Sequence, residues 1–419
     1  MMKEFDLLII GGGAAGLMAA GLAGQTGARV AVIEHMPRPA RKILVTGKGR
    51  CNLTNLTDLE GLVAHTPRGG RFLYSAYSAM MPGDVMTLFE QLGVSLKTER
   101  GNRVFPQSDR AMDIADALVS HARAGGAQFI TGRAKALIVK EGAVAGLTLD
   151  NGQTLSAAHV IVATGGLSYP TTGATGDGYR LAAEAGHTII ETAPSLVGLT
   201  AHEGFCSELA GLTLKNIALT IVKEGQKKPV YTDFGELLFT HTGISGPMVL
   251  SASAHMDKPA AGSYRAVIDF KPALDTEKLE NRLLRDWSAN PAAPLKGALR
   301  SLFPKNLAPV VFSRLSLPNE TRCSDVTREQ RRQLADLIKA FSVTITGTES
   351  IERAVVTRGG VSTREIDPAT MQSKICKGLY FAGEVMDLDG YTGGFNLQIA
   401  FSTGAAAGRA AALAVKSQK

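Results

Sequence analysis

The 419-residue sequence predicts an α/β protein in which a Rossmann-like dinucleotide-binding domain is interrupted by an inserted domain. Three observations predict this fold class. An apolar strand at 7–10 runs into a glycine-rich turn, a helix of small residues and a second strand at 29–33. The alternation of helix and strand patterns gives way after about Pro194 to short strand-like runs and then a helical stretch. It returns after Gly359 with one more strand and a long helix.

The N-terminal motif has the residue types that a pyrophosphate site needs. Gly11 permits the tight turn after the strand, Gly13 lets the backbone approach a phosphate, and Gly16 lets helix and sheet pack closely. The helix N-terminus offers free N–H groups and a positive dipole to the phosphates. Glu34 ends the second strand and can accept hydrogen bonds from a ribose. Two small residues that open the helix belong to the same predicted site: Ala14 and Ala15.

The later elements follow from periodicity and turn residues. Apolar positions three and four apart predict a helix over 110–124, and residues 133–149 have the pattern of a hairpin that turns near Glu141. A strand at His159–Ala163 runs into a second glycine-rich turn. The further expected elements are strands at Leu212–Val222, Glu236–Thr240 and Tyr264–Phe270, a helical stretch over 276–340, a strand pair near 342–346 and 351–357, a strand at Leu379–Ala382 and a helix over 398–415.

These patterns give the expected domain bounds. A chain of this length is too long for one ordinary core and suits two or three domains. We expect the dinucleotide-binding domain to comprise 1–190 and 350–419. The inserted domain then comprises 191–349, with a β-rich part over 191–272 and a helical part over 273–341.

Composition excludes several functional classes. The net charge is +7, but the basic residues are dispersed, so we expect no nucleic-acid partner. No paired cysteine motif occurs, which argues against zinc and against a disulfide redox centre, and we expect no metal. Residues 7–24 are uncharged, yet glycines interrupt them at a predicted turn, and with only Lys3 as a basic flank we do not expect this stretch to be a signal peptide. We therefore expect a cytoplasmic protein without membrane attachment.

Two segments favour FAD over NAD as the dinucleotide. Thr164 and Gly165 follow a strand, and such small residues let the chain pass close to a bulky cofactor. Gly383 and Glu384 end a later buried strand, where a carboxylate can accept hydrogen bonds from ribityl hydroxyls. The helix that opens after Gly393 can stabilise negative charge on a reduced flavin ring.

The order of these segments resembles the glutathione-reductase-type FAD fold. More narrowly, several strings resemble the BaiN/YhiN-like family, which includes aminoacetone-oxidase-like FAD enzymes. The resemblance covers almost the whole chain and implies an FAD domain with an inserted β-barrel-like domain that carries a helical lid. The strings that carry it are GKGRCNLTN at 47–55, RVFP at 103–106, the residues from Ser168 to Tyr179, LFTHTGISGP at 238–247 and the residues from Glu384 to Gln398.

The resemblance also implies further cofactor contacts. Arg41 or Lys42 would offset pyrophosphate charge, and Ala134 would flank the adenine. Gly49 would lie along the cofactor and Arg50, Cys51 and Asn52 near the flavin ring. Gly394, Phe395 and Asn396 would lie at the isoalloxazine edge. Disulfide reductases carry a redox cysteine pair just after the second strand, where this chain has only Cys51. We interpret Cys51 as a small residue packed beside the flavin, with a catalytic thiol as the alternative.

Three functions remain open from the sequence. The first is an oxidoreductase in which NAD(P)H reduces FAD and FAD reduces an unsaturated small molecule. The second is an amine oxidase that produces hydrogen peroxide, and the third is a flavin-binding protein associated with RNA. No second GxGxxG occurs within 191–349, so NAD(P)H would dock transiently. Three residues beside glycine-rich or proline-containing turns are candidate catalytic groups: Tyr169, His241 and Tyr391.

Overall fold

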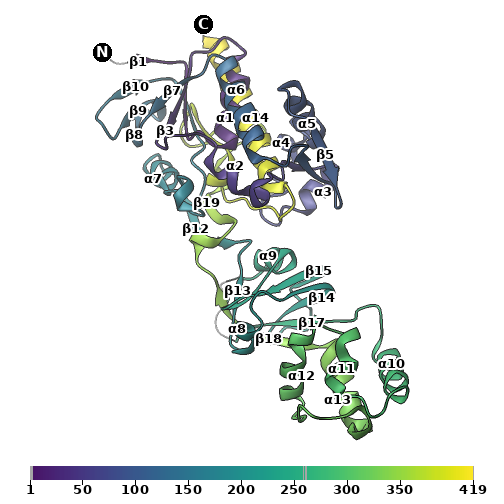
Figure 1. The fold of residues 1–419 in the computed structure, drawn as a ribbon. Helices are drawn as coiled ribbons and strands as arrows, with labels where there is room; N and C mark the ends of the chain where they lie inside the picture. The colour runs from purple at the N-terminus through teal and green to yellow at the C-terminus, as the bar shows by residue number, and fades with distance from the viewer. Residues whose placement is uncertain (1–2, 258, 260–261, 419) are drawn as a thin grey trace. The chain divides into compact units, whose positions relative to one another are not determined.

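The computed structural model describes residues 3–257, 259 and 262–418. The chain forms two compact units (Figure 1). Unit 1 comprises Met1–Ser195 and Ile351–Lys419, and unit 2 comprises Leu196–Ser350. Each unit has its own hydrophobic core.

Unit 1 is built on a five-stranded parallel sheet whose strands run in the order β20-β11-β2-β3-β7. The strands are short and apolar, and β2 and β11 are wholly buried, as expected for a parallel sheet covered on both faces. Their bounds are Leu379–Phe381 for β20, His159–Val162 for β11, Leu7–Ile10 for β2, Val30–Glu34 for β3 and Gln128–Thr131 for β7.

Smaller sheets surround this parallel sheet. One has the order β1-β10-β9-β8, a second has the order β4-β6-β5, and β12 pairs antiparallel with β19. Their bounds are Lys3–Glu4 for β1, Thr154–Ser156 for β10, Ala143–Leu149 for β9, Ala134–Lys140 for β8, Thr54–Asn55 for β4, Arg103–Pro106 for β6, Leu96–Glu99 for β5, Ile189–Ser195 for β12 and Val356–Val361 for β19.

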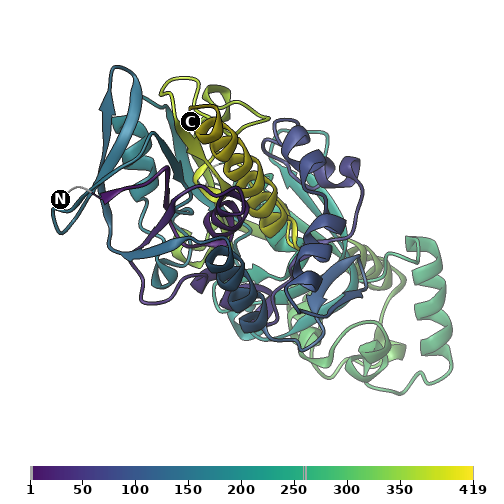
Figure 2. The ribbon, with the colours of Figure 1, turned by 90° about the horizontal axis from the view of Figure 1, so that it is seen from above.

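Helices complete unit 1. The long C-terminal helix α14 runs beside α1, and α1 also packs against α6 (Figures 1 and 2). The bounds are Ala14–Gly24 for α1, Arg41–Val45 for α2, Leu59–Ala64 for α3, Tyr74–Ala79 for α4, Pro82–Gln91 for α5, Ala111–Ala124 for α6, Asp177–Glu184 for α7 and Phe395–Gln418 for α14.

Small residues let α1 and α14 approach at backbone distance. A Cβ atom added at Gly404 would lie 2.4 Å from the carbonyl oxygen of Ala15, and one added at Gly408 would lie 2.6 Å from that of Ala19. Such separations leave no room for a side chain. The buried helix pair therefore depends on glycine at these positions, and it holds the N-terminus of α1 against the carboxyl end of β2.

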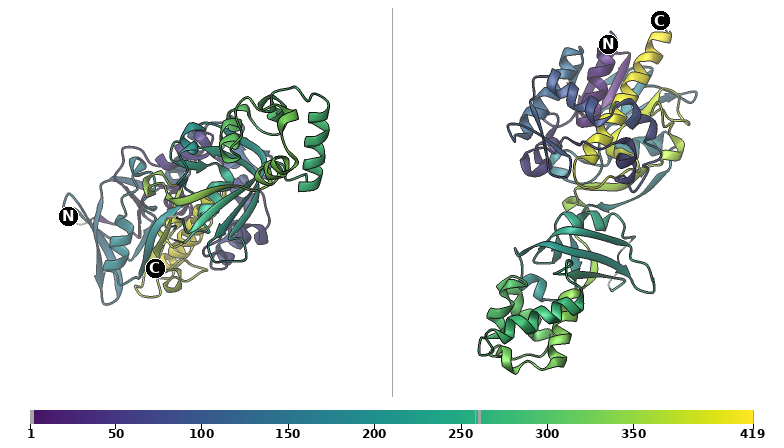
Figure 3. Two further views of the ribbon diagram at one scale, coloured as in Figure 1. Left: turned by 90° about the horizontal axis from the view of Figure 1, so that it is seen from below. Right: turned by 90° about the vertical axis from the view of Figure 1, so that its right-hand side faces the viewer.

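Unit 2 contains a closed antiparallel barrel with the order β13-β16-β15-β14-β17-β18, and the helices α10 to α13 lie between β17 and β18 along the chain (Figure 3). The barrel and the parallel sheet confirm the predicted fold class. The strands are Leu199–Ala201 for β13, Thr213–Lys223 for β14, Tyr231–Phe239 for β15, Gly243–Ser245 for β16, Tyr264–Asp269 for β17 and Phe341–Thr348 for β18.

The helices of unit 2 pack one apolar face on the barrel core. In α10 this face comprises Leu279, Leu283 and Trp287, at the spacing that places side chains on one side of a helix. The bounds are Phe205–Glu208 for α8, Pro247–Ser253 for α9, Thr276–Ser288 for α10, Leu295–Ala298 for α11, Ala308–Arg314 for α12 and Arg328–Lys339 for α13.

The expected strand pair near 342–346 and 351–357 is wrong. The first strand exists as β18, but it pairs with β13 and β17 inside the barrel. Residues Ile351–Arg353 form a 3-10 turn, and the next strand, β19, pairs with β12 in unit 1. Both segments have the alternating pattern of strands, and this pattern does not specify the partner of a strand.

Among the residues that the structure describes, no helix combines the length and apolar character needed to cross a bilayer.

We expect Gly408→Val to lower the melting temperature of unit 1 by several degrees. The added methyl groups would collide with the backbone of Ala19, and overpacking of this kind costs about 1–3 kcal/mol. Gly83→Ala in α5 is the matched control, because nothing lies within 4 Å of its added Cβ. The control should raise stability slightly, by up to about 1 kcal/mol. Thermal unfolding followed by circular dichroism measures both, and equal melting temperatures would contradict the packing argument.

Candidate functional site

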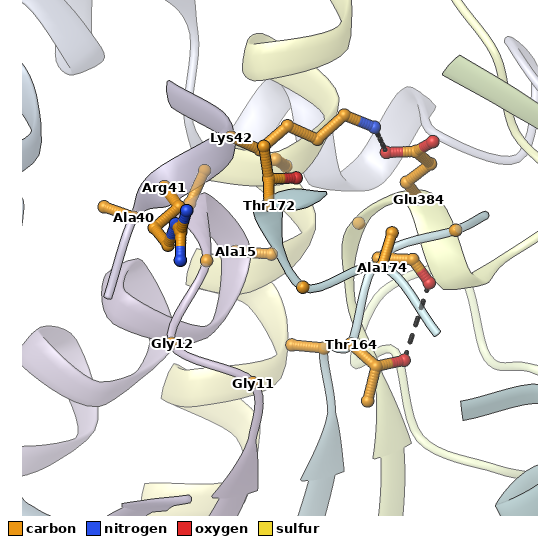
Figure 4. A pocket seen from close by; sticks show the side chains of 18 of the residues that line it. Gly11, Gly12, Ala15, Ala40, Arg41, Lys42, Thr164, Thr172, Ala174 and Glu384 are labelled. Atoms are coloured by element: carbon orange, nitrogen blue, oxygen red, sulfur yellow. Dashed lines mark hydrogen bonds and ion pairs between the residues drawn. The ribbon is translucent and has the colours of Figure 1, made fainter. Parts of the chain in front are cut away.

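A deep cleft lies at the carboxyl ends of the parallel strands of unit 1 and is lined by unit 1 alone (Figure 4). It holds about 1400 Å³ of space free of protein atoms, its open mouth included. Ligand pockets usually span about 300–1,000 Å³, so the space suits an extended ligand. The loops after β2, β3 and β11 and the N-terminal part of α14 supply most of its wall.

The glycine-rich turn after β2 presents bare backbone to the cleft. Gly11 has φ +105°, and a Cβ added there would lie 2.5 Å from the carbonyl oxygen of Ala163. A Cβ added at Gly16 would lie 2.0 Å from the carbonyl oxygen of Gly11, so helix and strand touch. Gly13 begins α1 without a side-chain cap and faces open space. The first N–H groups of α1 can therefore receive a phosphate.

Glu34 ends β3 and fixes the glycine turn. Its Oε2 accepts a hydrogen bond from the Gly12 N–H at 2.8 Å, and its Oε1 accepts one from the Met36 N–H at 2.8 Å. Each carboxylate oxygen has two lone pairs, so both retain capacity for a further donor. The carboxylate therefore orders the turn and can also receive ribose hydroxyls.

A four-residue network crosses the cleft wall. Lys42 Nζ lies 2.6 Å from Glu384 Oε2 and 2.7 Å from Ser168 Oγ (Figure 4). Glu384 Oε1 accepts hydrogen bonds from Ser168 Oγ at 3.0 Å and from the Thr357 N–H at 2.8 Å. The Lys42 ammonium is thus neutralised by a carboxylate from a segment far along the chain. The Glu384 side chain is 17% exposed and still borders the cleft.

Two arginines beside the glycine turn differ in their partners. Arg38 lies 2.6 Å from Asp116. Arg41 lines the cleft, and within the described part of the chain it has no ion-pair partner. The sequence left Arg41 and Lys42 as alternative pyrophosphate partners. Because Lys42 is engaged by Glu384, Arg41 is the cation left for a phosphate.

An ion pair closes the end of the cleft beside Ala134. Arg133 Nε lies 2.6 Å from Asp177 Oδ2, and all three residues line the cleft. Burial opposes ionisation of Asp177, yet the Arg133 guanidinium holds the pKa of that carboxyl below its ordinary value. Thr175 Oγ1 also donates to Asp177 at 2.8 Å. A nucleotide base next to Ala134 would be bordered by this charged pair.

The Gly49–Asn52 segment lies outside the cleft lining. Arg50 is held by Glu99 and Asp109 and lies 4.2 Å above the Phe105 ring. Cys51 is fully buried with φ +59°, and burial raises its thiol pKa to about 12. A neutral, enclosed thiol is a poor nucleophile. The buried Asn52 Oδ1 has no hydrogen-bond partner among the described residues.

The start of α14 contributes unevenly. Asn396 lines the cleft, whereas Gly394 and Phe395 lie outside its lining. Gly394 has φ +101°, and an added Cβ would lie 2.3 Å from the backbone of Thr54. Phe395 is buried and stacks on the His65 ring with centroids 4.6 Å apart. These residues shape the helix start from behind the cleft wall.

The three candidate catalytic residues occupy different places. Tyr169 has φ +53° and precedes the 3-10 turn Pro170–Thr172 in unit 1. Tyr391 is partly buried in unit 1, and its N–H donates to the carbonyl of His65 at 2.9 Å. His241 is exposed after β15 in unit 2. The structure therefore brings Tyr169 and Tyr391 into one unit and leaves His241 in the other.

Most of the proposed cofactor residues converge on the cleft. Those that line it are Gly11, Gly13, Ala14, Ala15, Glu34, Arg41, Lys42, Ala134, Thr164, Gly165, Gly383, Glu384 and Asn396. Lining residues that sequence reasoning did not place in the site include Gly12, His35, Thr46, Gly132, Thr172, Gly173, Ala174, Thr175, Asp177, Leu388 and Leu397. Gly173 packs against His35 and Met36, so the 172–175 loop covers the segment after Glu34. Its signals in the sequence were a run of small and glycine residues and its place within the Ser168–Tyr179 string that carries the family resemblance.

The cleft fits a dinucleotide on its own geometry. Bare backbone at Gly11 and Gly13, an uncapped helix start, one free arginine and a carboxylate at the end of β3 are the parts that a pyrophosphate and a ribose require. Within the described ranges, no group of three or more His, Cys, Asp or Glu side chains is arranged to hold a metal ion.

Comparisons with known proteins agree with this geometry. The profile of a family described as HI0933-like protein Rossmann domain matches residues 5–410. The chain is 36% identical over 403 residues to a protein named ribosomal RNA dihydrouridine synthase from Escherichia coli, with 96% of each chain covered. It is 33% identical over 414 residues to a protein named 3-dehydro-bile acid delta(4,6)-reductase from Clostridium scindens, with 96% of this chain and 98% of that protein covered.

Solved structures share the fold at low sequence identity. A 3-ketosteroid delta1-dehydrogenase from Sterolibacterium denitrificans superposes with a TM-score of 0.52 at 14% identity, covering 99% of this chain and 100% of that one. The FrdA chain of quinol fumarate reductase from Escherichia coli gives 0.53 at 17% identity, covering 100% and 72%. At these identities the likeness shows the fold alone.

We expect Glu34→Ala to weaken retention of the dinucleotide at least tenfold. The change removes two acceptors for backbone N–H groups and the proposed ribose acceptor, and a hydrogen bond to a charged group is worth about 1.5–3 kcal/mol. Cofactor occupancy after gel filtration and a dissociation constant from fluorescence titration measure it. Glu90→Ala, at an exposed position of α5, is the control. Full occupancy in Glu34→Ala would contradict the assignment.

We expect the thiols of the folded protein to resist Ellman's reagent at pH 8. All four cysteines are buried, and burial raises the pKa of Cys51 and Cys206 to about 12, so little thiolate exists. Fewer than one thiol per chain should react within minutes, and all four should react in guanidinium chloride. Rapid modification of Cys51 in the folded protein, located by peptide mass spectrometry, would restore the catalytic thiol as a candidate.

Proposed function

From the membership of this chain in the HI0933-like family, which is shown by the match over 5–410 and by relatives above 30% identity, we propose a specific reaction. The chain is an FAD-dependent oxidoreductase of the Rossmann type, as the BaiN/YhiN-like resemblance implied. The proposed reaction is reduction of a carbon–carbon double bond conjugated to a carbonyl group, with NAD(P)H as the electron donor.

The names of the relatives support this reaction class. A dihydrouridine synthase adds two hydrogens to a uracil ring, at a double bond conjugated to a carbonyl. A 3-dehydro-bile acid delta(4,6)-reductase acts on double bonds of a 3-keto compound. The two substrates differ in size and charge, but the double bonds have the same electronic character. The chain, which is related to both, is therefore proposed to act on the same kind of bond.

The cleft residues have distinct proposed roles. Gly13 and the start of α1 would hold the pyrophosphate with Arg41, and Glu34 would hold the adenosine ribose. The Arg133–Asp177 pair would border the adenine. When bound, FAD supplies hydride transfer at N5 of its flavin ring. The chain orients the cofactor and shapes the space over that ring.

The network of Lys42 and Glu384 is proposed to act at the ribityl chain. Glu384 already accepts three hydrogen bonds, from Lys42, Ser168 and Thr357, so its position is fixed before a cofactor arrives. Because this carboxylate is already fixed, little further side-chain entropy is lost when a ribityl hydroxyl binds to it. Lys42 offers its remaining proton to the same chain.

A second candidate is that the double bond belongs to a uracil within RNA. The relatives named ribosomal RNA dihydrouridine synthase favour it, at 36% identity for the Escherichia coli protein and 32% for the one from Haemophilus influenzae. The exposed Arg328 and Arg332 of α13 could contact phosphates. The dispersed charge of the chain favours a small molecule, which we retain as the first candidate. An amine oxidase is the third.

Anaerobic stopped-flow measurement of the flavin absorbance tests the proposal. We expect NADPH or NADH to bleach the flavin of the purified holoprotein and a conjugated enone such as 2-cyclohexenone to restore the absorbance. Because we expect NAD(P)H to dock transiently over the flavin ring and not in a domain of its own, we expect a high KM for the nicotinamide cofactor. The saturated ketone cyclohexanone, which lacks the carbon–carbon double bond, is the control oxidant and should not restore the flavin absorbance.

The alternatives give different results in the same apparatus. Bleaching by an amine with hydrogen peroxide formed under air would support the oxidase. Restored absorbance with a uridine-containing ribosomal RNA fragment, but not with cyclohexenone, would support the RNA candidate. Failure of every alkene and amine to change the flavin absorbance would contradict all three.

A further inference from the structure

We propose that Tyr391 donates the proton that completes reduction of the conjugated double bond, and that His65 positions it. This inference rests on the proposed function and adds a proton donor to it. It is carried by the loop from Asp389 to Gly394, here called the 389–394 loop, which leads into α14.

The 389–394 loop is fixed along its whole length. The fully buried Asp389 accepts hydrogen bonds from Ser195 Oγ at 2.5 Å and from Arg68 at 3.3 Å. Asn396 accepts from the Gly390 N–H at 2.9 Å and donates to the carbonyls of Gly390 at 2.8 Å and of Tyr391 at 3.2 Å. Its far end is held where the Gly393 carbonyl accepts from Asn55 at 3.1 Å.

This loop lies next to the end of the cleft away from the adenosine, although none of its own residues is part of the cleft lining. Leu388 and Asn396 flank the loop in sequence, and both line the cleft. Glu34 ends β3, whereas the loop follows β20, and the sheet order places β11 and β2 between those two strands. A dinucleotide with its adenosine at Glu34 therefore directs its other end toward the side of the sheet from which the 389–394 loop arises.

His65 restrains Tyr391 from a second side. The Tyr391 N–H donates to the His65 carbonyl at 2.9 Å, and the two rings meet edge to face with centroids 5.7 Å apart. His65 is itself fixed: its ring stacks on Phe395, and its Nδ1 lies 2.7 Å from the Gly61 carbonyl, which can only accept. Tyr391 is therefore held by groups whose own positions are determined, as catalytic side chains require.

The reaction needs a proton at one carbon. Reduction places a hydride on the carbon β to the carbonyl, and the pair of π electrons leaves the α-carbon as a carbanion conjugated with the carbonyl. The Tyr391 hydroxyl gives its proton to that α-carbon, and the tyrosinate oxygen then takes a proton from water. Tyr169 lies on a separate turn, and His241 is exposed in unit 2.

The test uses holoprotein reduced by dithionite, so that it does not depend on NAD(P)H. Reduced wild type and Tyr391→Phe are mixed anaerobically with 2-cyclohexenone or with 1-nitrocyclohexene. The nitro group stabilises the anion that hydride transfer to this alkene produces, so its reduction does not depend on a proton donor. We expect Tyr391→Phe to slow reoxidation by the enone about 100-fold or more, with the rate for the nitroalkene unchanged. Tyr74→Phe, at an exposed position of α4, should match wild type with both.

His65 variants test the positioning role. His65→Ala should slow the enone reaction about 10–100-fold, the cost of a small misplacement, and leave the nitroalkene reaction unchanged. His65→Phe keeps a ring against Tyr391 and should restore much of the rate. Equal enone rates in wild type and His65→Ala would overturn this role.

The remaining outcomes separate the two proposals. Wild-type enone rates in Tyr391→Phe would overturn the proton donor while the proposed function stands. Tyr391→Phe could instead slow reoxidation by both alkenes, or change the flavin spectrum or the FAD dissociation constant. Either result would assign Tyr391 a structural role. Failure of both alkenes to reoxidise the wild type would contradict the proposed function, and the proton donor with it.

Discussion

Unit 1 depends on the close approach of backbone segments to one another at the carboxyl end of β2. Gly11 meets the carbonyl of Ala163, Gly16 meets the carbonyl of Gly11, and Gly404 of α14 meets that of Ala15. Each contact brings two backbones closer than any side chain allows. Together they fix the start of α1 between the sheet and α14, so its free N–H groups point into the cleft. The position of a phosphate is set by packing before any ligand arrives.

Local patterns in the sequence were sufficient for most elements and for the glycine turn, because strand, turn and helix there are adjacent. The predicted helix over 110–124 matches α6, and the predicted strand at Leu379–Ala382 matches β20. Partners far apart in sequence could not be predicted. The Lys42–Glu384 pair joins residues 342 positions apart, and nothing near either residue indicates the other. The supposed strand pair at 342–357 failed for the same reason, since pairing is decided by tertiary structure.

The residues of the site likewise differ in how well the sequence alone predicts them. Residues that act through backbone geometry, such as Gly11 and Gly16, could be predicted because only glycine fits there. Residues that act through their side chains were harder to place: Arg50 has the charge for a cofactor contact, but Glu99 and Asp109 engage it outside the cleft. His65 went unnoticed because a single histidine after a short helix has no pattern of its own. Its importance lies in its contacts with Phe395 and Tyr391.

Charge balance in the cleft bears on how the cofactor is held. A pyrophosphate carries about two negative charges, and the sequence offers two adjacent cations, Arg41 and Lys42. The structure commits Lys42 to Glu384, so this pair adds no net charge where the ribityl chain would lie. In the proposed binding mode, Arg41 and the dipole of α1, equivalent to about half a charge, would face the phosphates. The positive charge available would thus be smaller than the negative charge of the pyrophosphate. Retention of the cofactor would then come largely from hydrogen bonds to fixed backbone and to Glu34. Such bonds recognise the shape of a dinucleotide, whereas excess positive charge would attract any anion.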